Sequence, residues 1–405
     1  MIKNYLASFK GLSNQVWLLA LILLVNRSGT MVIPFLSIYM TQSLGLSLQQ
    51  SGVVLMFFGI GAVIGNYLGG KLADRYGAFP ILFSSMFLTG VMFLIMEHVT
   101  SYVGLCVAVL LTTVLADIFR PANMKALAEK SLPENRTRSI SLIRLSFNLG
   151  WAIAPAVGGV AIAWYGYAWL FRLDGATCIA ASILILLLLD RKTNVEDKAL
   201  EQIQDKRNSK TIPMKFWLFL SANFLGMVSF MQIVSALPVF YRAEVGLSEQ
   251  VIGGLMALNG IFIAVFEMPF VFKYEKRFSA MTMVMWGTVL FAISYFIFNF
   301  GSTLLLSIAC ILMLSIGEIL QMPFANAWIL SIAPEERIGQ YMAYYGISFS
   351  LSFIVAPPLG MYLADHLGYL PMWNIMSAIG LIAALAFYML NREMSFDREK
   401  KGGLV

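Results

Sequence analysis

The chain has 405 residues, of which 59% are hydrophobic and only 12% are charged, and its mean hydropathy is +0.77. These values lie far from those of soluble globular domains, and they exclude most soluble enzymes and binding modules. The surplus of six positive charges is distributed by predicted loop rather than by face. It therefore indicates orientation in a membrane, and we expect no nucleic-acid partner.

Twelve apolar runs follow one another along the chain, and each is long enough to cross about 30 Å of hydrocarbon as a helix. They lie near residues 15–41, 50–71, 79–97, 100–130, 137–164 and 169–189, and then near 213–243, 249–272, 278–298, 302–332, 337–364 and 370–391. Backbone groups in lipid must be hydrogen-bonded, and runs of this length fit helices rather than barrel strands. The sequence predicts an all-α membrane protein with twelve transmembrane helices.

The two halves of the chain repeat one another at a constant offset of 201 positions, with a one-residue slip near the end. The matching pairs are Gly45 with Gly246, Leu46 with Leu247, Ser47 with Ser248, Gln49 with Gln250, Gly52 with Gly253, Asp117 with Glu318, Pro133 with Pro334, Glu134 with Glu335, and, after the slip, Ala154 with Ala356 and Pro155 with Pro357. Such a duplication is typical of bundles that move a solute. We expect six-helix bundles at residues 1–189 and 213–405, joined by a linker at 190–212.

Basic residues are concentrated in the predicted loops on one side of the membrane, and the polar linker together with Lys215 just after it adds seven more to that side. The opposite side holds little beyond Arg172 and Arg242. The positive-inside rule therefore predicts a plasma (inner) membrane protein with both termini and the linker in the cytoplasm. We interpret the linker as a flexible or partly helical tether and not as a regulatory site.

The loop between the second and third runs reads GKLADRYG, in which Gly70 and Gly77 permit a tight turn and Asp74 with Arg75 can pair with a neighbouring helix end. This pattern resembles the signature loop of the major facilitator superfamily. The two basic residues that close the family pattern are absent here. The resemblance implies two six-helix domains that alternate about a site at the membrane midplane.

A second resemblance to this superfamily lies in the fifth run, which reads GWAIAPAVGG. It is similar to a glycine and proline motif associated with antiporters, with Ala154 where glycine is usual. Gly150, Gly158 and Gly159 allow close helix approach, and Pro155 allows a bend. Tight packing without any bearing on the direction of transport is an equal alternative.

The fourth and tenth runs contain ADIFRPAN and GEILQMPFAN, which are partly similar to helices of proton-dependent oligopeptide transporters. Arg120 precedes Pro121, and Glu318 lies five positions before Pro323, as in that family. The acidic motif of that family's first helix is absent, and only Arg27 remains of it. Similar tenth-helix patterns occur among multidrug exporters, so these motifs leave uptake and efflux open.

Ionised side chains are costly inside a membrane, so those within the spans and away from their ends are candidates for function. They are Arg27, Asp117, Arg120, Arg144, Glu267 and Glu318. Glu318 is the first choice for proton coupling because a desolvated carboxyl group can take up a proton. Asp117 is its repeat counterpart, and an ion pair with Arg120 is the alternative. Glu267 is a further candidate, with structural pairing as its alternative.

Candidates for substrate binding are cationic, polar or aromatic residues within the same spans. They are Arg27, Asn26, Arg120, Arg144, Tyr344, Tyr345 and Trp328. Guanidinium groups can hold an anionic group of a solute, or neutralise a buried carboxylate, and aromatic side chains can line an adaptable cavity. Contact with lipid is the alternative for most of the aromatic residues.

We predict a proton-coupled exporter of small organic compounds that acts as a monomer in the lipid bilayer by alternating access. Proton-driven uptake of peptides or related zwitterions is the alternative, and a membrane sensor or scaffold without transport is an alternative of another class. No cofactor or metal site is expected, since the three cysteines lack paired spacing and nearby histidines. An enzyme is not expected, because no nucleophile, base and orienting group form a recognisable set.

Overall fold

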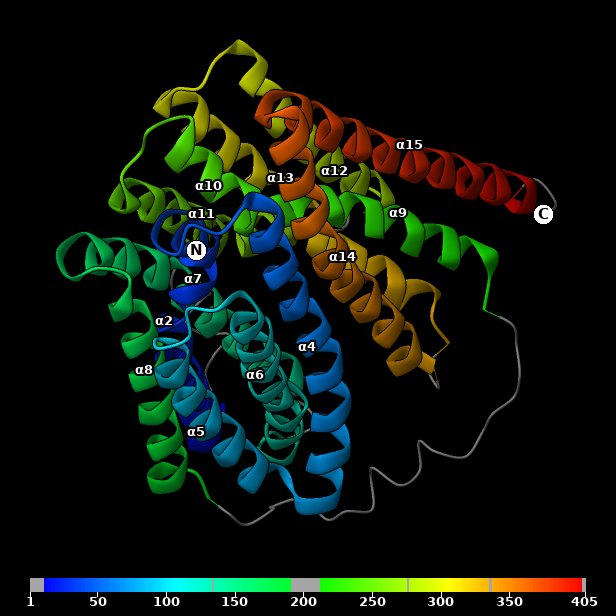
Figure 1. Ribbon diagram of the computed structural model, residues 1–405. Coiled ribbons are helices and arrows are strands. Elements are labelled where there is room, and N and C mark those ends of the chain that lie inside the picture. Colours follow the sequence, from blue (N-terminus) through cyan, green and yellow to red (C-terminus); the bar gives the residue numbers. More distant parts are fainter. Residues whose placement is uncertain (1–10, 133–134, 191–211, 275–276, 335–336, 403–405) are drawn as a thin grey trace. The chain divides into compact units, whose positions relative to one another are not determined.

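The computed structural model describes residues 11–132, 135–190, 212–274, 277–334 and 337–402, and the predicted linker at 190–212 lies almost entirely outside them. Its first half contains α2 (Asn14–Ser28), α3 (Val32–Ile38), η1 (Tyr39–Ser43), α4 (Leu48–Tyr76), α5 (Ala78–Met96), α6 (Tyr102–Lys130), α7 (Arg136–Tyr165) and α8 (Ala168–Leu188). Its second half contains α9 (Met214–Phe230), η5 (Met231–Val234), α10 (Ala236–Ala243), α11 (Glu249–Tyr274), α12 (Ala280–Phe296), η6 (Ile297–Phe300), α13 (Leu304–Ile332), α14 (Ile338–Leu367) and α15 (Tyr369–Gly402). Figure 1 shows these helices in chain order.

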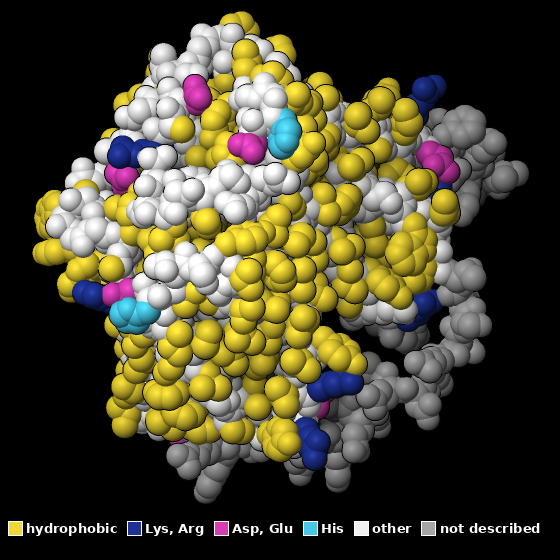
Figure 2. Space-filling view, viewed as in Figure 1, with side chains coloured by type: hydrophobic (Ala, Val, Ile, Leu, Met, Phe, Trp, Pro, Cys, Tyr) yellow, Lys and Arg dark blue, Asp and Glu magenta, His cyan; other side chains and the backbone are white. Residues whose placement is uncertain are grey.

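Twelve helical segments of the described residues are long and apolar enough to cross a membrane. They coincide with the twelve predicted runs to within a few residues, and the described part of the chain contains no strand. Hydrophobic side chains cover most of the face seen in Figure 2, and charged side chains on it are few and scattered. A surface of this kind fits lipid as its solvent, and the predicted all-α, twelve-span fold class is confirmed.

Contacts divide the chain into two compact units. The first comprises the described residues of Met1–Leu46, Val53–Gln202 and Ser248–Ile261, and the second those of Ser47–Gly52, Ile203–Leu247 and Phe262–Val405. Each unit is therefore built mainly from one repeat and takes in a short segment of the other, at the start of α4 or of α11.

The helices of each unit pack in the same pairs. In the first unit α5 packs on α6 and α8, and α2 packs on α7 and α8 (Figure 1). In the second unit the corresponding α12 packs on α13 and α15, and α9 packs on α14 and α15. The repeat seen in the sequence is thus a repeat of helix packing, and even the turns at Gly45 and Gly246 share a positive φ, of 67° and 74°.

Helix α4 approaches α6 through three glycines spaced four residues apart. A Cβ atom built on Gly61, Gly65 or Gly69 would meet a backbone carbonyl oxygen of α6 at less than 3 Å. Glycine at this spacing lets two backbones touch, which favours helix association in lipid. The corresponding positions of α11 hold Phe262 and Phe266, whose rings lie 4.6 Å apart, and Phe270.

The first span of each repeat is broken in its middle, whereas the apolar runs predict single helices. In the first repeat α2 ends at Ser28 and α3 begins at Val32. In the second, α9 gives way to the 3₁₀ turn η5, and α10 begins at Ala236. The mean hydropathy of each span does not register these breaks, because apolar neighbours outweigh the polar residues at them, such as Arg27, Ser28 and Gln232.

Candidate functional site

A charged cluster lies where α2, α4, α6 and α7 of the first unit meet. The Arg120 Nε atom is 3.6 Å from Asp117 Oδ1 on the same helix. Asp117 also interacts with the side chain of Asn66 on α4 and with Arg27 on α2. The Arg27 guanidinium carbon lies 4.8 Å from the ring centroid of Phe147. The guanidinium groups of Arg27 and Arg120 thus share the carboxylate of Asp117, and the ring of Phe147 covers the guanidinium group of Arg27.

Two features of this cluster leave it able to receive a further group. The Nε atom of Arg27 is buried and has no hydrogen-bond partner among the described residues. The Arg120 side chain is 53% exposed, whereas that of Asp117 is 15% exposed. A guanidinium group has five donors, so the cluster can still donate to an anionic group. The remaining predicted arginine, Arg144, lies on the exposed side of α7.

The second unit carries a neutral network at the corresponding place. Gln321, which holds the repeat position of Arg120, donates from Nε2 to Asn223 Oδ1 at 2.8 Å. Asn223 donates in turn to the Ser348 hydroxyl at 3.2 Å. Asn223 and Gln321 are 0% and 1% exposed. Buried amides need hydrogen-bond partners, and side chains of α9, α13 and α14 pair both amide groups of this network. The Gln321 Oε1 atom alone is buried without a partner among the described residues of the network.

The two carboxylates predicted for the second unit stand at repeat positions of the first cluster. Glu318, half-buried on α13, corresponds to Asp117. Glu267, which is 7% exposed on α11, corresponds to Asn66. The first unit therefore has one carboxylate beside an amide where the second has two carboxylates at equivalent positions.

Two other predicted substrate residues, Asn26 and Trp328, lie in helix packing. Asn26 donates to Met86 Sδ at 3.0 Å and Cys178 Sγ at 3.2 Å, inside the packing of α2 with α5 and α8. Trp328 is 5% exposed, and its ring stacks on Phe219 at 4.3 Å.

The tyrosines predicted to line a cavity are half-buried on α14. The ring of Tyr344 lies 5.2 Å from that of Trp217, and its hydroxyl accepts a hydrogen bond from Gln340. Tyr345 also packs against the core of the second unit.

The signature loop joins α4 to α5 by a turn of one residue, Gly77, whose φ of 85° favours glycine. The Lys125 amine on α6 lies 3.2 Å from Asp74 and donates to the Ala73 carbonyl at 3.0 Å, so it caps the end of α4. Arg75 lies over the ring of Tyr76. Asp74 is 80% exposed, which makes its ion pair weak.

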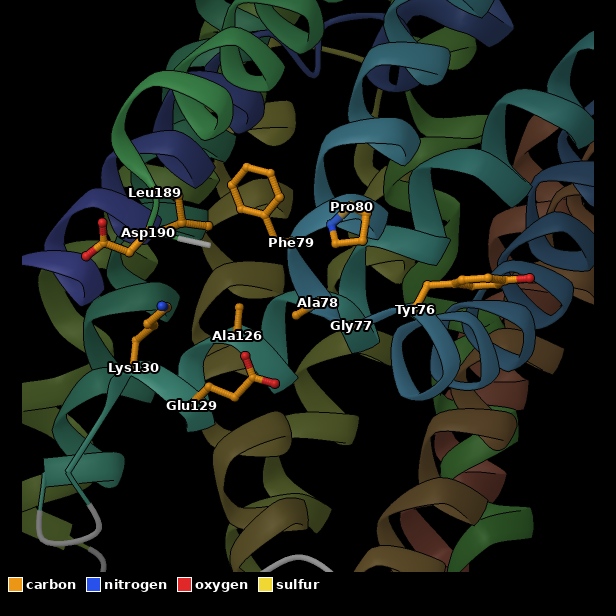
Figure 3. A pocket seen from close by; sticks show the side chains of 10 residues that line it. All are labelled: Tyr76, Gly77, Ala78, Phe79, Pro80, Ala126, Glu129, Lys130, Leu189 and Asp190. Carbon is orange, nitrogen blue, oxygen red and sulfur yellow. The ribbon is translucent and has the colours of Figure 1, made fainter. Parts of the chain in front are cut away.

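A cavity of about 130 Å³ opens beside this loop (Figure 3). Its lining residues come from the loop and from the ends of α6 and α8, and they are Tyr76, Gly77, Ala78, Phe79, Pro80, Ala126, Glu129, Lys130, Leu189 and Asp190. Drug-sized ligands occupy pockets of about 300–1,000 Å³. The cavity is too small for such a solute, and it does not include the Arg27 cluster.

The glycine and proline motif of α7 brings two other helices close. Gly150 lies against the backbone of Arg27, and Gly158 lies against Met31 of the first span. On the other side, Gly159 lies against the backbone of Glu249 on α11. Gly253 of α11 lies against the Pro155 carbonyl group. The motif thus packs α7 between the broken first span and the start of α11, both within the first unit.

Asp174 is not among the predicted functional residues because it lies near the start of its span. In the structure its carboxylate is 1% exposed and accepts the backbone N–H groups of Met31 at 2.8 Å and Val32 at 3.1 Å. A carboxylate within the apolar run of α8 is the signal that could have identified it. The described residues contain no group of three or more His, Cys, Asp or Glu side chains that could hold a metal ion.

Twelve spans, an internal repeat and broken first helices in both halves define the fold of a secondary transporter. The family model of the major facilitator superfamily matches residues 16–281 and 218–403, so the chain belongs to that superfamily. The predicted resemblance is confirmed, and the chain is a transporter of this kind and not an enzyme.

Curated relatives include transporters with several named roles. A Na(+), Li(+), K(+)/H(+) antiporter of Planococcus maritimus is 24% identical over 82% of this chain and 85% of its own length. The multidrug resistance protein MdtH of Edwardsiella ictaluri is 23% identical over 93% of this chain and 94% of its own. The quinolone resistance protein NorA of Staphylococcus aureus (strain MSSA476) is 27% identical over 64% and 66%.

Among solved structures, a peptide transporter POT in complex with sulfate superposes with a TM-score of 0.80 at 14% identity, covering 95% of this chain and 96% of that one. At this identity the likeness concerns the fold.

Proposed function

We propose that the chain is a proton-coupled exporter of small amphipathic organic compounds, in which Glu318 carries the proton. It works by alternating access of two six-helix domains, at residues 1–189 and 213–405, joined by a cytoplasmic linker at 190–212. The positions of basic residues support a plasma membrane location with both termini in the cytoplasm. The named roles of relatives in antiport, multidrug resistance and quinolone resistance support export.

The observation that carries this proposal is the exchange of partners between equivalent positions of the two units. In the first unit Asp117 has Asn66 and Arg120 as neighbours. In the second, Glu318 has Glu267 and Gln321 at those positions, and the Gln321 amide is engaged with Asn223. We assign proton exchange to Glu318 because a carboxyl group that is desolvated inside a membrane span can take up a proton. Asp117, beside two guanidinium groups, is assigned to ion pairing.

The Arg27 cluster is assigned to an anionic group of the solute. The buried Nε atom of Arg27 and the exposed guanidinium of Arg120 provide donors in a half-buried setting. A zwitterion that carries a carboxylate and an amine, as quinolones do, would place its carboxylate there. The same donors also favour the second candidate function, proton-driven uptake of peptides or related zwitterions.

Transport of a fluorescent quinolone by proteoliposomes, with an imposed pH gradient of either sign, tests the proposal. We expect the quinolone to move in the direction opposite to that in which protons flow. Accumulation of the quinolone in the compartment that protons enter would support uptake instead. In Glu318→Gln we expect gradient-driven transport to be lost while solute exchange persists, because the amide keeps the shape but cannot titrate. Asp117→Asn is the matched control at the equivalent position. Wild-type pH dependence in Glu318→Gln would overturn the assignment.

A further inference from the structure

The break in the first span exposes backbone groups that must be satisfied inside the membrane. Gly29 and Thr30 separate α2 from the next segment, in which the N–H groups of Met31 and Val32 lie ahead of the first turn of α3 and the Met31 N–H donates to the Gly29 carbonyl at 2.6 Å. An unpaired backbone group in hydrocarbon costs several kcal/mol. Both N–H groups donate to the two carboxylate oxygens of Asp174 on α8, at 2.8 Å and 3.1 Å.

The neighbouring helix is shaped to reach this break. Thr177 lies one turn after Asp174, and a Cβ atom on Gly29 would overlap its side chain. The Thr177 hydroxyl donates to the Leu173 carbonyl of its own helix at 2.9 Å, so it caps nothing in the first span. The close approach packs the end of α2 on α8, and the bidentate carboxylate fixes the start of α3 to the same helix.

The short helix α3 continues into η1 and places Tyr39 on the same packing surface. The Tyr39 ring lies 5.3 Å from Phe171 and 5.7 Å from Tyr167. The Tyr167 hydroxyl donates to Glu249 at the start of α11 at 2.9 Å. The segment of residues 31–43 is therefore joined to α8 and to its preceding turn at two places.

The break of the second repeat is satisfied differently. Gln232, at the repeat position of Met31, donates from Nε2 to the Ala356 carbonyl of α14 at 2.9 Å and accepts from the Ser235 hydroxyl at 3.0 Å. That break is held by side chains of its own span, whereas the first is held by a carboxylate from another helix.

We propose that Asp174 is a positioning residue that pins α3 and η1 to α8, so that the hinge at residues 29–31, between this segment and the Arg27-bearing helix α2, is held at one angle while α2 stays packed on α8. The effect on transport rests on the proposed function, but the pinning itself does not.

Electron paramagnetic resonance distances between spin labels test the pinning in the full chain. One label pair joins Gln42→Cys with Ile183→Cys, and a second joins Leu21→Cys with Ile183→Cys; Gln42 is exposed, and Leu21 and Ile183 are 46% and 47% exposed. The native cysteines Cys106, Cys178 and Cys310 are buried, and protein that carries them alone measures background labelling. In Asp174→Ala we expect the first distance distribution to broaden and the second to stay unchanged.

Asp174→Asn keeps one of the two acceptors, so it should broaden the first distribution less, and it also serves if the alanine variant does not fold. Thr177→Val is the matched control on the same helix and should leave both distributions as in wild type. Unchanged distributions in both Asp174 variants would overturn the proposal. So would an equal broadening of both label pairs, since that indicates general loosening.

Transport of the fluorescent quinolone distinguishes a role of Asp174 in the conformational change from a role in binding the solute. We expect Asp174→Asn to lower Vmax several-fold with little change in KM, because α2 and Arg27 keep their place. A rise in KM with unchanged Vmax would contradict the hinge. Absence of quinolone transport in wild type, with the expected distance changes, would count against the proposed function and leave the pinning intact.

Discussion

The two units share helix pairing but differ in where they place charge. Arg120 in the first unit is Gln321 in the second, whose amide pairs with Asn223. The Glu97–Arg172 pair that joins α5 and α8 has as its counterpart two amides, Asn299 and Asn374, which join η6 and α15. At these two places the repeat keeps the helix contact and has a neutral hydrogen bond in place of an ion pair.

This difference shows that equivalent helix contacts can be made by ion pairs or by neutral groups. The second unit uses both, because the Lys215 amine on α9 lies 3.2 Å from the carboxylate of Glu393 on α15. It also has Glu267 and Glu318 at the positions of Asn66 and Asp117. We propose a division of labour in which the first unit binds the solute and the second exchanges protons.

The largest expected effect is on the free energy of unfolding, and it tests the difference between the glycine contact of α4 and the equivalent position of α11. Gly65→Leu drives a side chain into the Val114 carbonyl of α6, and overpacking against backbone should cost about 3 kcal/mol or more. Phe266→Leu makes the same residue at the equivalent position of α11, where the native ring is 50% exposed, and should cost about 0.5 kcal/mol. Thermal unfolding of both purified variants measures the difference. Similar losses in both would show that the two contacts are alike.

A smaller effect tests the neutral network of the second unit. Asn223→Ala removes the acceptor of the buried Gln321 amide and should cost about 1–3 kcal/mol. Asn326→Ala is the control, because its amide donates only to the Met322 carbonyl of the same helix. The Tm of each variant reports the loss. A Tm for Asn223→Ala equal to that of the control would show that the Gln321–Asn223 hydrogen bond does not stabilise the second unit.

The smallest expected effect is on the pH dependence of Tm, which distinguishes the Glu97–Arg172 ion pair from its neutral counterpart in the second unit. Hydrogen bonds from Arg172 lower the pKa of the Glu97 carboxyl group, which lies just beyond α5. A lowered pKa in the folded state contributes stability above the unfolded value of about 4.3, and this contribution is lost as pH falls through the folded pKa. The double variant Glu97→Asn with Arg172→Asn copies the second unit and should flatten the acid limb of the Tm profile slightly. An unchanged acid limb would show that the pair does not contribute.

Much of the fold follows from the sequence because apolar runs near 20 residues have few other solutions in a membrane. The breaks after Ser28 and Phe230 could not be predicted from hydropathy, since apolar neighbours outweigh the polar residues at them, and the carboxylate that stabilises the first break comes from another helix. Gly61, Gly65 and Gly69 form a visible spacing, but only the structure identifies α6 as their partner.

The candidate site was predicted unevenly for a related reason. The ion pair of Asp117 with Arg120 is local, three residues apart on one helix, and was open to prediction. The pairing of Gln321 with Asn223 joins neutral residues far apart in the chain and carries no sequence pattern. Asn26 is predicted to bind because it is polar in an apolar run, and this role stays a prediction; in the structure its amide contacts two sulfur atoms within the bundle.

Proton movement driven by solute tests the division of labour most directly. A pH-sensitive dye enclosed in proteoliposomes records protons that cross when a quinolone gradient is applied without an imposed pH gradient. The account predicts a coupled proton flux in wild type and in Asp117→Asn, and none in Glu318→Gln. Flux that survives in Glu318→Gln but vanishes in Asp117→Asn would place the proton in the first unit and contradict the account.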